Sequence, residues 1–175
     1  VHAIEAYSSK SKNNNPISRM IAIEALKLLS GSIEKSVLDG SNLEARGNML
    51  IGAMLAGKAF ANSPVAAVHA LAYPIGGIYH VSHGLSNSLV LPYVLRFNSV
   101  DPKAAKDYSD LSKYVFPDLD INKGTQAVCA EFIDGIEDLS KRLGLPQKLR
   151  EVNIPKDACE KMASEAMKQT RLLVN

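Results

Sequence analysis

The chain has 175 residues, of which 46% are hydrophobic and 22% are charged, a composition typical of one globular domain with a sizeable core. Its net charge of +2 is too small to indicate nucleic acid or an anionic membrane surface as a partner. No apolar run reaches the roughly 18 residues that a membrane span needs, so we expect no membrane-spanning segment.

The N-terminal half of the chain is dominated by helical patterns. Asn15 and Pro16 predict a helix start, with Asn15 as the N-cap and Pro16 at the first helical position. We expect Gly31 to break the stretch that follows. A second long helix is predicted over about residues 42–61, and it contains many small residues, namely Gly47, Gly52, Ala53, Ala56, Gly57, Ala59 and Ala61. Because mid-helix glycine costs about 0.5–1 kcal/mol relative to alanine, this helix is expected to pack closely on neighbouring helices or to line a ligand pocket.

Proline and glycine residues divide the middle of the chain. Pro64 is expected to start a short helix over residues 65–73, and Pro74 to end it. Gly76 and Gly77 are expected to form a turn. The next helix is predicted over about residues 82–98, with a kink at its internal proline.

The C-terminal part of the chain also shows helical patterns. Asp101 and Pro102 predict another helix start, and two amphipathic helices are predicted over about residues 125–143 and 156–173. Cys129 and Cys159 are expected to be reduced core residues. Since no sustained period-two alternation is present, we predict one all-α domain over residues 1–175.

Three of the four histidines fall within fifteen residues, at His69, His80 and His83. A single histidine is more often a surface or hydrogen-bonded residue than a ligand, but His69 lies in an apolar helix. A buried imidazole there needs a partner for each nitrogen, and a metal on one with a hydrogen bond on the other would satisfy it. His83 stands at a helix start, where the dipole favours the neutral form that binds metals. His80 is interpreted as a solvated loop residue.

Five segments, in the same order along the chain, resemble the iron-containing (group III) alcohol dehydrogenases. They are His2-Ala3-Ile4-Glu5-Ala6-Tyr7, Asn15-Pro16-Ile17, Arg46-Gly47-Asn48-Met49-Leu50, residues 56–62 and residues 68–87. The last of them resembles the second signature of the family. The resemblance implies an all-α, helical-bundle C-terminal domain of the dehydroquinate-synthase-like architecture. In that family a nucleotide-binding α/β domain precedes the helical one, so we expect this chain to be a fragment that lacks it.

The resemblance also implies a metal site. The family ligands are one Asp and three His, and they map onto His2, His69 and His83, with the Asp expected four residues before His2 and outside this chain. The metal is expected to be Fe²⁺ or Zn²⁺, with NAD or NADP bound mainly by the missing domain. Phe60 aligns with a residue that lines the substrate pocket. Tyr73 stands where many members have a further His that assists proton transfer or contacts the nicotinamide, and Tyr is a poorer proton carrier near neutral pH.

The function implied by the resemblance is hydride transfer between an alcohol or aldehyde and nicotinamide, with the metal polarising the substrate oxygen. The isolated fragment is expected to be inactive. Three alternatives stay open: a maleylacetate reductase, a glycerol-type dehydrogenase of the same fold, and a non-catalytic helical module. Reduced cysteines and the lack of a leader-like start favour a cytoplasmic protein, and a homo-oligomer is left open.

Overall fold

The computed structural model describes residues 1–173, and the regular structure in this range is entirely helical. The α-helices are α1 (His2–Ser8), α2 (Pro16–Leu38), α3 (Leu43–Asn62), α4 (Ala67–Tyr79), α5 (His83–Asn98), α6 (Pro102–Val115), α7 (Thr125–Arg142) and α8 (Ala158–Met167). Short 3₁₀ helices span Ile121–Lys123, Leu149–Val152 and Thr170–Leu172. The prediction of an all-α fold is confirmed.

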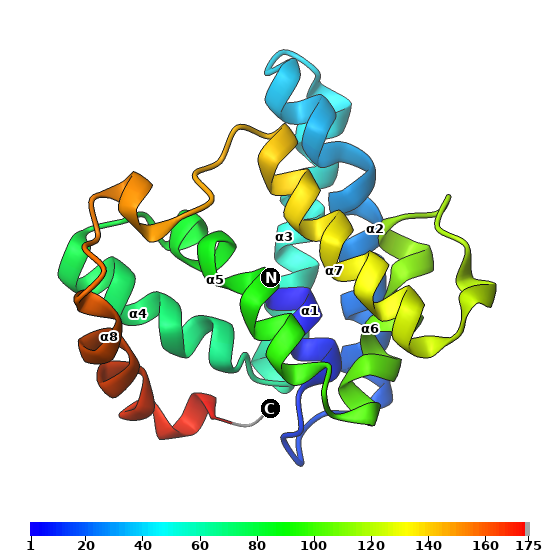
Figure 1. The fold of residues 1–175 in the computed structure, drawn as a ribbon. Helices are drawn as coiled ribbons and strands as arrows, with labels where there is room; N and C mark the ends of the chain where they lie inside the picture. The colour runs from blue at the N-terminus through cyan, green and yellow to red at the C-terminus, as the bar shows by residue number, and fades with distance from the viewer. Residues whose placement is uncertain (174–175) are drawn as a thin grey trace.

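The short helix α1 lies at the centre of the molecule. Figure 1 shows α2, α3, α6 and α7 gathered on one side of it, with α4 and α8 on the other. Helix α5 contacts both α4 and α7 and so connects the two groups. The arrangement brings helices from distant parts of the sequence around α1, which carries one of the candidate ligands.

Two predicted helix starts are confirmed by their caps. The Asn15 side chain accepts hydrogen bonds from the backbone N–H groups of Ile17 and Ser18, and Pro16 is the first residue of α2. Asp101 caps α6 in the same way, by accepting from the backbone N–H groups that follow Pro102. These contacts involve residues two or three positions apart, which is why the sequence alone predicts them.

The prediction that Pro74 ends a helix is wrong. Pro74 lies inside α4, and so do Gly76 and Gly77, which were expected to form a turn. Proline removes one backbone hydrogen bond, but residues 74 and 75 are buried, and α4 packs against α5 and α8. The reversal between α4 and α5 occurs instead at His80, whose φ of 56° places it in the left-handed region.

Three smaller predictions also need correction. Gly31 does not break α2, which continues to Leu38 as it packs along α3. The helix expected over residues 156–173 is shorter, since α8 ends at Met167 and a 3₁₀ turn follows. Cys129 is buried in the core as expected, but Cys159, on α8, is exposed.

Helix α1 is held in place by its neighbours. It has seven residues, whereas isolated helices shorter than about 12 residues are marginal in water. Residues 3–7 are all buried, and α1 packs against α2, α3 and α6. The Ser63 hydroxyl, directly after α3, donates a 2.6 Å hydrogen bond to the Ala6 carbonyl. Tertiary packing therefore fixes the position of α1.

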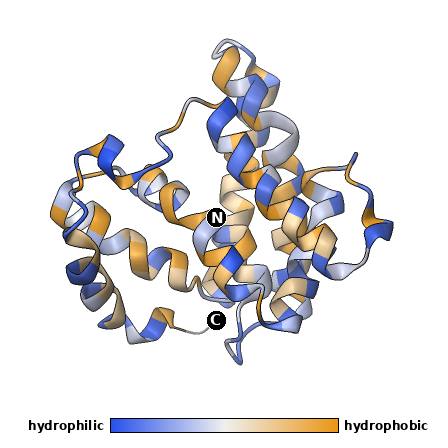
Figure 2. Cartoon of the chain, viewed as in Figure 1, coloured by the Kyte–Doolittle hydropathy of each residue, from blue (hydrophilic) through white to orange (hydrophobic). Residues whose placement is uncertain are grey.

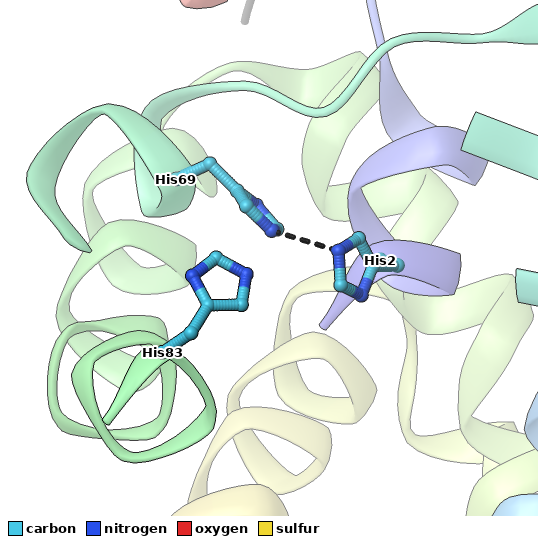
Figure 3. Close-up of side chains that lie close together, drawn as sticks. All are labelled: His2, His69 and His83. Carbon is cyan, nitrogen blue, oxygen red and sulfur yellow. Dashed lines mark hydrogen bonds between the residues drawn. The ribbon is translucent and has the colours of Figure 1, made fainter. Parts of the chain in front are cut away.

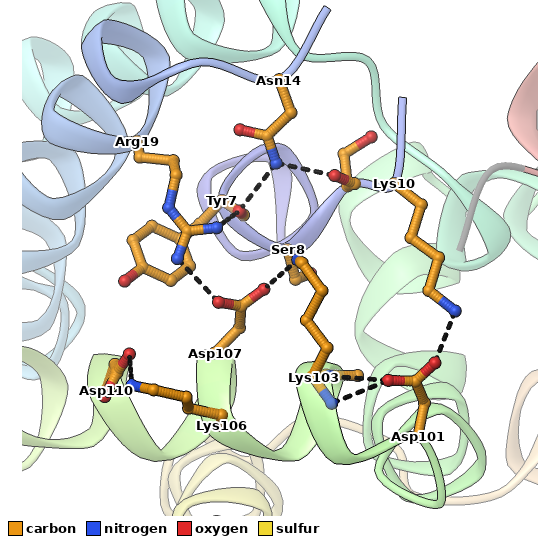
Figure 4. A network of polar contacts seen from close by, with 12 residues as sticks. Tyr7, Ser8, Lys10, Asn14, Arg19, Asp101, Lys103, Lys106, Asp107 and Asp110 are labelled. Carbon is orange, nitrogen blue, oxygen red and sulfur yellow. Dashed lines mark hydrogen bonds and ion pairs between the residues drawn. The ribbon is translucent and has the colours of Figure 1, made fainter. Parts of the chain in front are cut away.

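A polar network holds the C-terminal end of α1 between α2 and α6 (Figure 4). Arg19 on α2 donates to the Tyr7 carbonyl at 2.9 Å and to the Asp107 carboxylate on α6 at 2.6 Å. Its guanidinium also lies 3.8 Å from the centre of the Tyr7 ring. Asn14 donates to the same Tyr7 carbonyl, and Lys103 donates to Asp107 at 2.9 Å. The buried Asp107 carboxylate thus has a cation on each oxygen, as a buried charge requires.

Hydrophobic residues are frequent in helices α3 and α4, whereas the loop between α1 and α2 is hydrophilic (Figure 2). By itself, no described helix is both long and apolar enough to cross a membrane. Helices α3 and α4 meet that test only as a pair, and they are bent by 111° relative to each other.

The small residues of α3 explain how closely it approaches α2. Gly52, Ala56 and Ala59 are buried on one face of α3. A Cβ placed on Gly52 would lie 2.7 Å from Cγ of Leu29 and 3.3 Å from the carbonyl oxygen of residue 25. A Cβ on Gly57, by contrast, would meet nothing within 4 Å. The small residues on the buried face therefore serve helix packing.

The Gly52→Ala substitution is expected to lower the free energy of unfolding by about 1–3 kcal/mol, because the added methyl overlaps Leu29 on α2. Gly57→Ala is the matched control and should raise stability by about 0.5–1 kcal/mol through helix propensity alone. Urea denaturation of both variants measures the difference. Equal stability of the two variants would contradict the proposed close approach of the helices.

Candidate metal centre

Three histidines converge from three different helices (Figure 3). His2 is the first residue of α1, His69 lies in the first turn of α4, and His83 is the first residue of α5. One ring nitrogen from each lies within 4.8 Å of the other two. The structure thus brings together the three residues that the sequence suggested as metal ligands, which we call the histidine cluster.

The spacing of the histidine cluster fits a divalent metal ion. The Nε2 atoms of His2 and His69 are 3.0 Å apart. Two nitrogens bound at about 2.0–2.1 Å to one ion lie about 3.0–3.4 Å apart, depending on the angle between them. The ring of His83 completes the group from an exposed position, with its centre 5.3 Å from that of His69 and 6.0 Å from that of His2. The donor set is therefore three imidazoles around one point.

The electrostatics of the histidine cluster favour a neutral His2 ring. Burial, together with the nearby His69 and His83, lowers the pKa of His2 to about 4. At neutral pH the His2 imidazole is therefore uncharged, which is the form that coordinates metals. Two Nε2 atoms facing each other at 3.0 Å need either a shared proton or a common cation between them. The neutral His2 ring and the short distance between the two Nε2 atoms both fit a bound metal ion.

Glu5 holds His69 from the side opposite the cluster. One carboxylate oxygen of Glu5 lies 2.5 Å from Nδ1 of His69, and the other accepts a 2.8 Å hydrogen bond from the backbone N–H of Val68. Both residues of this hydrogen-bonded pair are buried, with 5% of Glu5 and 2% of His69 exposed. The sequence shows Glu5 only as the acid three positions after His2, because its partners lie more than sixty residues away. The spacing of three residues from His2 along α1 was therefore the one feature of the sequence that pointed to Glu5.

His83 and His80 lie at opposite ends of the short link between α4 and α5. The buried Asn87 side chain donates a 2.9 Å hydrogen bond to the His83 carbonyl, and its amide nitrogen lies 3.2 Å from the ring Nε2 of His83. His80 is exposed and lies outside the histidine cluster, so its interpretation as a loop residue is confirmed. Ser82 occupies the N-cap position of α5, but its side chain makes no capping hydrogen bond.

Phe60 lies against the histidine cluster, and Tyr73 lies one helical turn from it. The ring of Phe60, near the end of α3, stacks on His2 with 4.7 Å between the ring centres and 25° between the planes. Phe60 is 36% exposed, so one side of its ring is open. Tyr73 is 37% exposed and lies four residues after His69 on α4, and residues at that spacing share a face of a helix. Both rings are therefore accessible near the cluster.

Comparison with known proteins identifies the family of the chain. The sequence matches the C-terminal part of the Fe-containing alcohol dehydrogenase family over residues 1–175. Long-chain-alcohol dehydrogenase 1 from Geobacillus thermodenitrificans is 37% identical over 98% of this chain and 42% of its own length. The 1,3-propanediol dehydrogenase from Citrobacter freundii is 34% identical over 99% of this chain and 44% of its own length.

Solved structures show the same fold. A 1,3-propanediol oxidoreductase superposes with a TM-score of 0.89 at 34% identity, over 96% of this chain and 43% of its own. A maleylacetate reductase from Rhizobium sp., at 24% identity and a TM-score of 0.75 over 96% of this chain and 43% of its own, shares the fold alone. The chain spans less than half the length of the relatives it matches. From its match along all 175 residues, the chain belongs to the Fe-containing alcohol dehydrogenase family, in the C-terminal part of those enzymes.

Proposed function

We propose that this chain is the metal-binding part of an NAD(P)-dependent alcohol dehydrogenase, which transfers hydride between an alcohol or aldehyde and nicotinamide. The observation that carries the proposal is the convergence of three histidines, with two Nε2 atoms 3.0 Å apart, in a member of this family. Relatives named for long-chain alcohols and for 1,3-propanediol support a primary alcohol as the class of substrate.

Each residue of the site has a defined part in the proposed reaction. A divalent ion, Fe²⁺ or Zn²⁺, would supply Lewis-acid polarisation of the substrate oxygen. His2, His69 and His83 hold that ion with neutral nitrogens, and three protein nitrogens leave room for a fourth ligand and for substrate. The Asp expected four residues before His2 is proposed as the fourth ligand. It would supply the one negative charge of the set.

Phe60 and Tyr73 are proposed to shape the substrate side of the site. Phe60 covers the face of His2, so its exposed side offers an apolar wall to the carbon chain of an alcohol. Tyr73 presents a hydroxyl one turn along α4 from His69, where it can hydrogen-bond to substrate or to the nicotinamide. A hydroxyl moves protons less readily than an imidazole near neutral pH. Tyr73 is therefore proposed to orient the substrate or the nicotinamide more than to transfer a proton.

The nucleotide is proposed to bind outside this chain. The matched relatives are more than twice as long as the segment they share with it. We infer that residues 1–175 form one helical metal-binding domain that works joined to a nucleotide-binding domain. By itself the chain is then inactive, because it holds neither the whole ligand set nor the cofactor.

Replacing His83 by alanine is expected to weaken Fe²⁺, Zn²⁺ or Co²⁺ binding by at least about 100-fold, since one of three nitrogen ligands is lost. His83 is exposed, so the fold should be unaffected. The control is His80→Asn, which changes another exposed histidine three residues earlier and suits its left-handed backbone. Titration of metal against a competing chelator, on the polypeptide extended to the length of its relatives, gives both affinities. Equal metal affinities in the two variants would contradict the proposed metal site.

The extended polypeptide, loaded with Fe²⁺ or Zn²⁺, is expected to form NADH or NADPH when a primary alcohol is added. His83→Ala should lower kcat/KM by at least about 100-fold, because a metal contributes several kcal/mol and about 1.4 kcal/mol is tenfold. The isolated chain should show no activity. Turnover of maleylacetate without any alcohol or aldehyde activity would favour a maleylacetate reductase. Silence with every substrate and both nucleotides would favour a non-catalytic helical module.

A further inference from the structure

We propose that Glu5 is a positioning residue, which fixes the tautomer of His69 so that the lone pair of Nε2 faces His2 and His83. The inference rests on the proposed metal-binding role of the histidine cluster. It goes beyond that role by assigning a function to a buried acid that is not itself a ligand. Glu5 lies at Nδ1 of His69, on the side away from the point where the three rings meet.

Both oxygens of the Glu5 carboxylate have fixed partners. One accepts from the backbone N–H of Val68, in the first turn of α4, where the N-cap residue Ala66 offers no side-chain cap. An unpaired N–H at a helix start needs an acceptor, and a negative charge is favoured there. The other oxygen then points at Nδ1 of His69 from a buried position. The Val68 contact therefore sets which way the carboxylate faces.

A carboxylate anion can only accept hydrogen bonds, so the Nδ1 atom that it contacts carries the proton. A neutral imidazole with its proton on Nδ1 has a free lone pair on Nε2, and that atom lies 3.0 Å from Nε2 of His2. Carboxylates that orient metal-binding histidines in this way contribute about 10–100-fold to metal affinity. Helix α1 thus supplies both a ligand, His2, and the residue that orients another ligand on α4.

The substitution Glu5→Gln distinguishes positioning from packing, because it preserves shape and reverses the hydrogen bond. Val68 N–H still requires an acceptor, so the Gln carbonyl oxygen must take that place. The Gln NH₂ group must then face Nδ1 of His69 and donate to it. Nδ1 becomes an acceptor, and the proton of the neutral ring moves to Nε2, where it occupies the lone pair that a metal needs.

The test uses the extended polypeptide in two measurements. The first is ¹⁵N NMR of labelled histidine in the metal-free protein at pH 8, which reports the protonation of each nitrogen of His69. The second is Co²⁺ affinity, measured by competition with a chelator, for the parent protein, Glu5→Gln and Glu137→Gln. Glu137 is the matched control, since it undergoes the same Glu-to-Gln change, has two cationic partners, Arg96 and Lys141, and lies on α7.

We expect Nδ1 of His69 to be protonated in the parent protein and unprotonated in Glu5→Gln. Co²⁺ affinity should fall by about 10–100-fold in Glu5→Gln and stay within about twofold in Glu137→Gln. An unprotonated Nδ1 in the parent protein overturns the inference whether or not the variant folds. A Co²⁺ affinity of Glu5→Gln within about twofold of the parent protein also overturns the inference. Unchanged Co²⁺ affinity in His83→Ala would instead contradict the proposed metal site.

Discussion

The burial of α1 is the constraint on which the rest of the structure depends. A seven-residue helix has too few hydrogen bonds to persist alone, so its position is decided by the helices that enclose it. Those are α2, α3 and α6, and they hold it through apolar packing, through Ser63 and through the Arg19–Asp107 network. His2 and Glu5 lie on this helix, so the enclosure of α1 also places one candidate ligand and the partner of another.

Two buried carboxylates, Glu5 on α1 and Asp107 on α6, hold α1 in different ways. Asp107 has two cationic partners, Arg19 and Lys103, and the charge is balanced as burial requires. Among the described residues, the hydrogen-bond partners of the Glu5 carboxylate are a backbone N–H and the imidazole of His69, not a lysine or an arginine. A buried acid with cationic partners, such as Asp107, stabilises the fold. A buried acid paired with an imidazole, such as Glu5, constrains the orientation of that ring, which metal binding requires more than packing does.

The candidate site lies where chain segments meet that are distant in sequence. His69 on α4 and His83 on α5 lie close together where these two helices pack against each other. His2 and Phe60 arrive from α1 and α3, which pack against each other. Metal affinity is therefore expected to respond to changes in helix packing as well as to changes in the ligands, since a displacement of α1 would move His2 and Glu5 together.

The sequence by itself determined the features that depend on neighbours along the chain: the capped starts at Asn15 and Asp101 and the helical period. It also singled out His69 and His83 as candidates, but the turn expected to bring them together is part of α4. His2 and Phe60 came from the family resemblance. Only the tertiary structure decided that α4 runs through Pro74, that Gly52 faces Leu29, and that Glu5 pairs with His69. The reason is physical. Caps and periodicity arise from hydrogen bonds and side chains within a few residues, whereas these three features depend on packing between segments far apart in the chain.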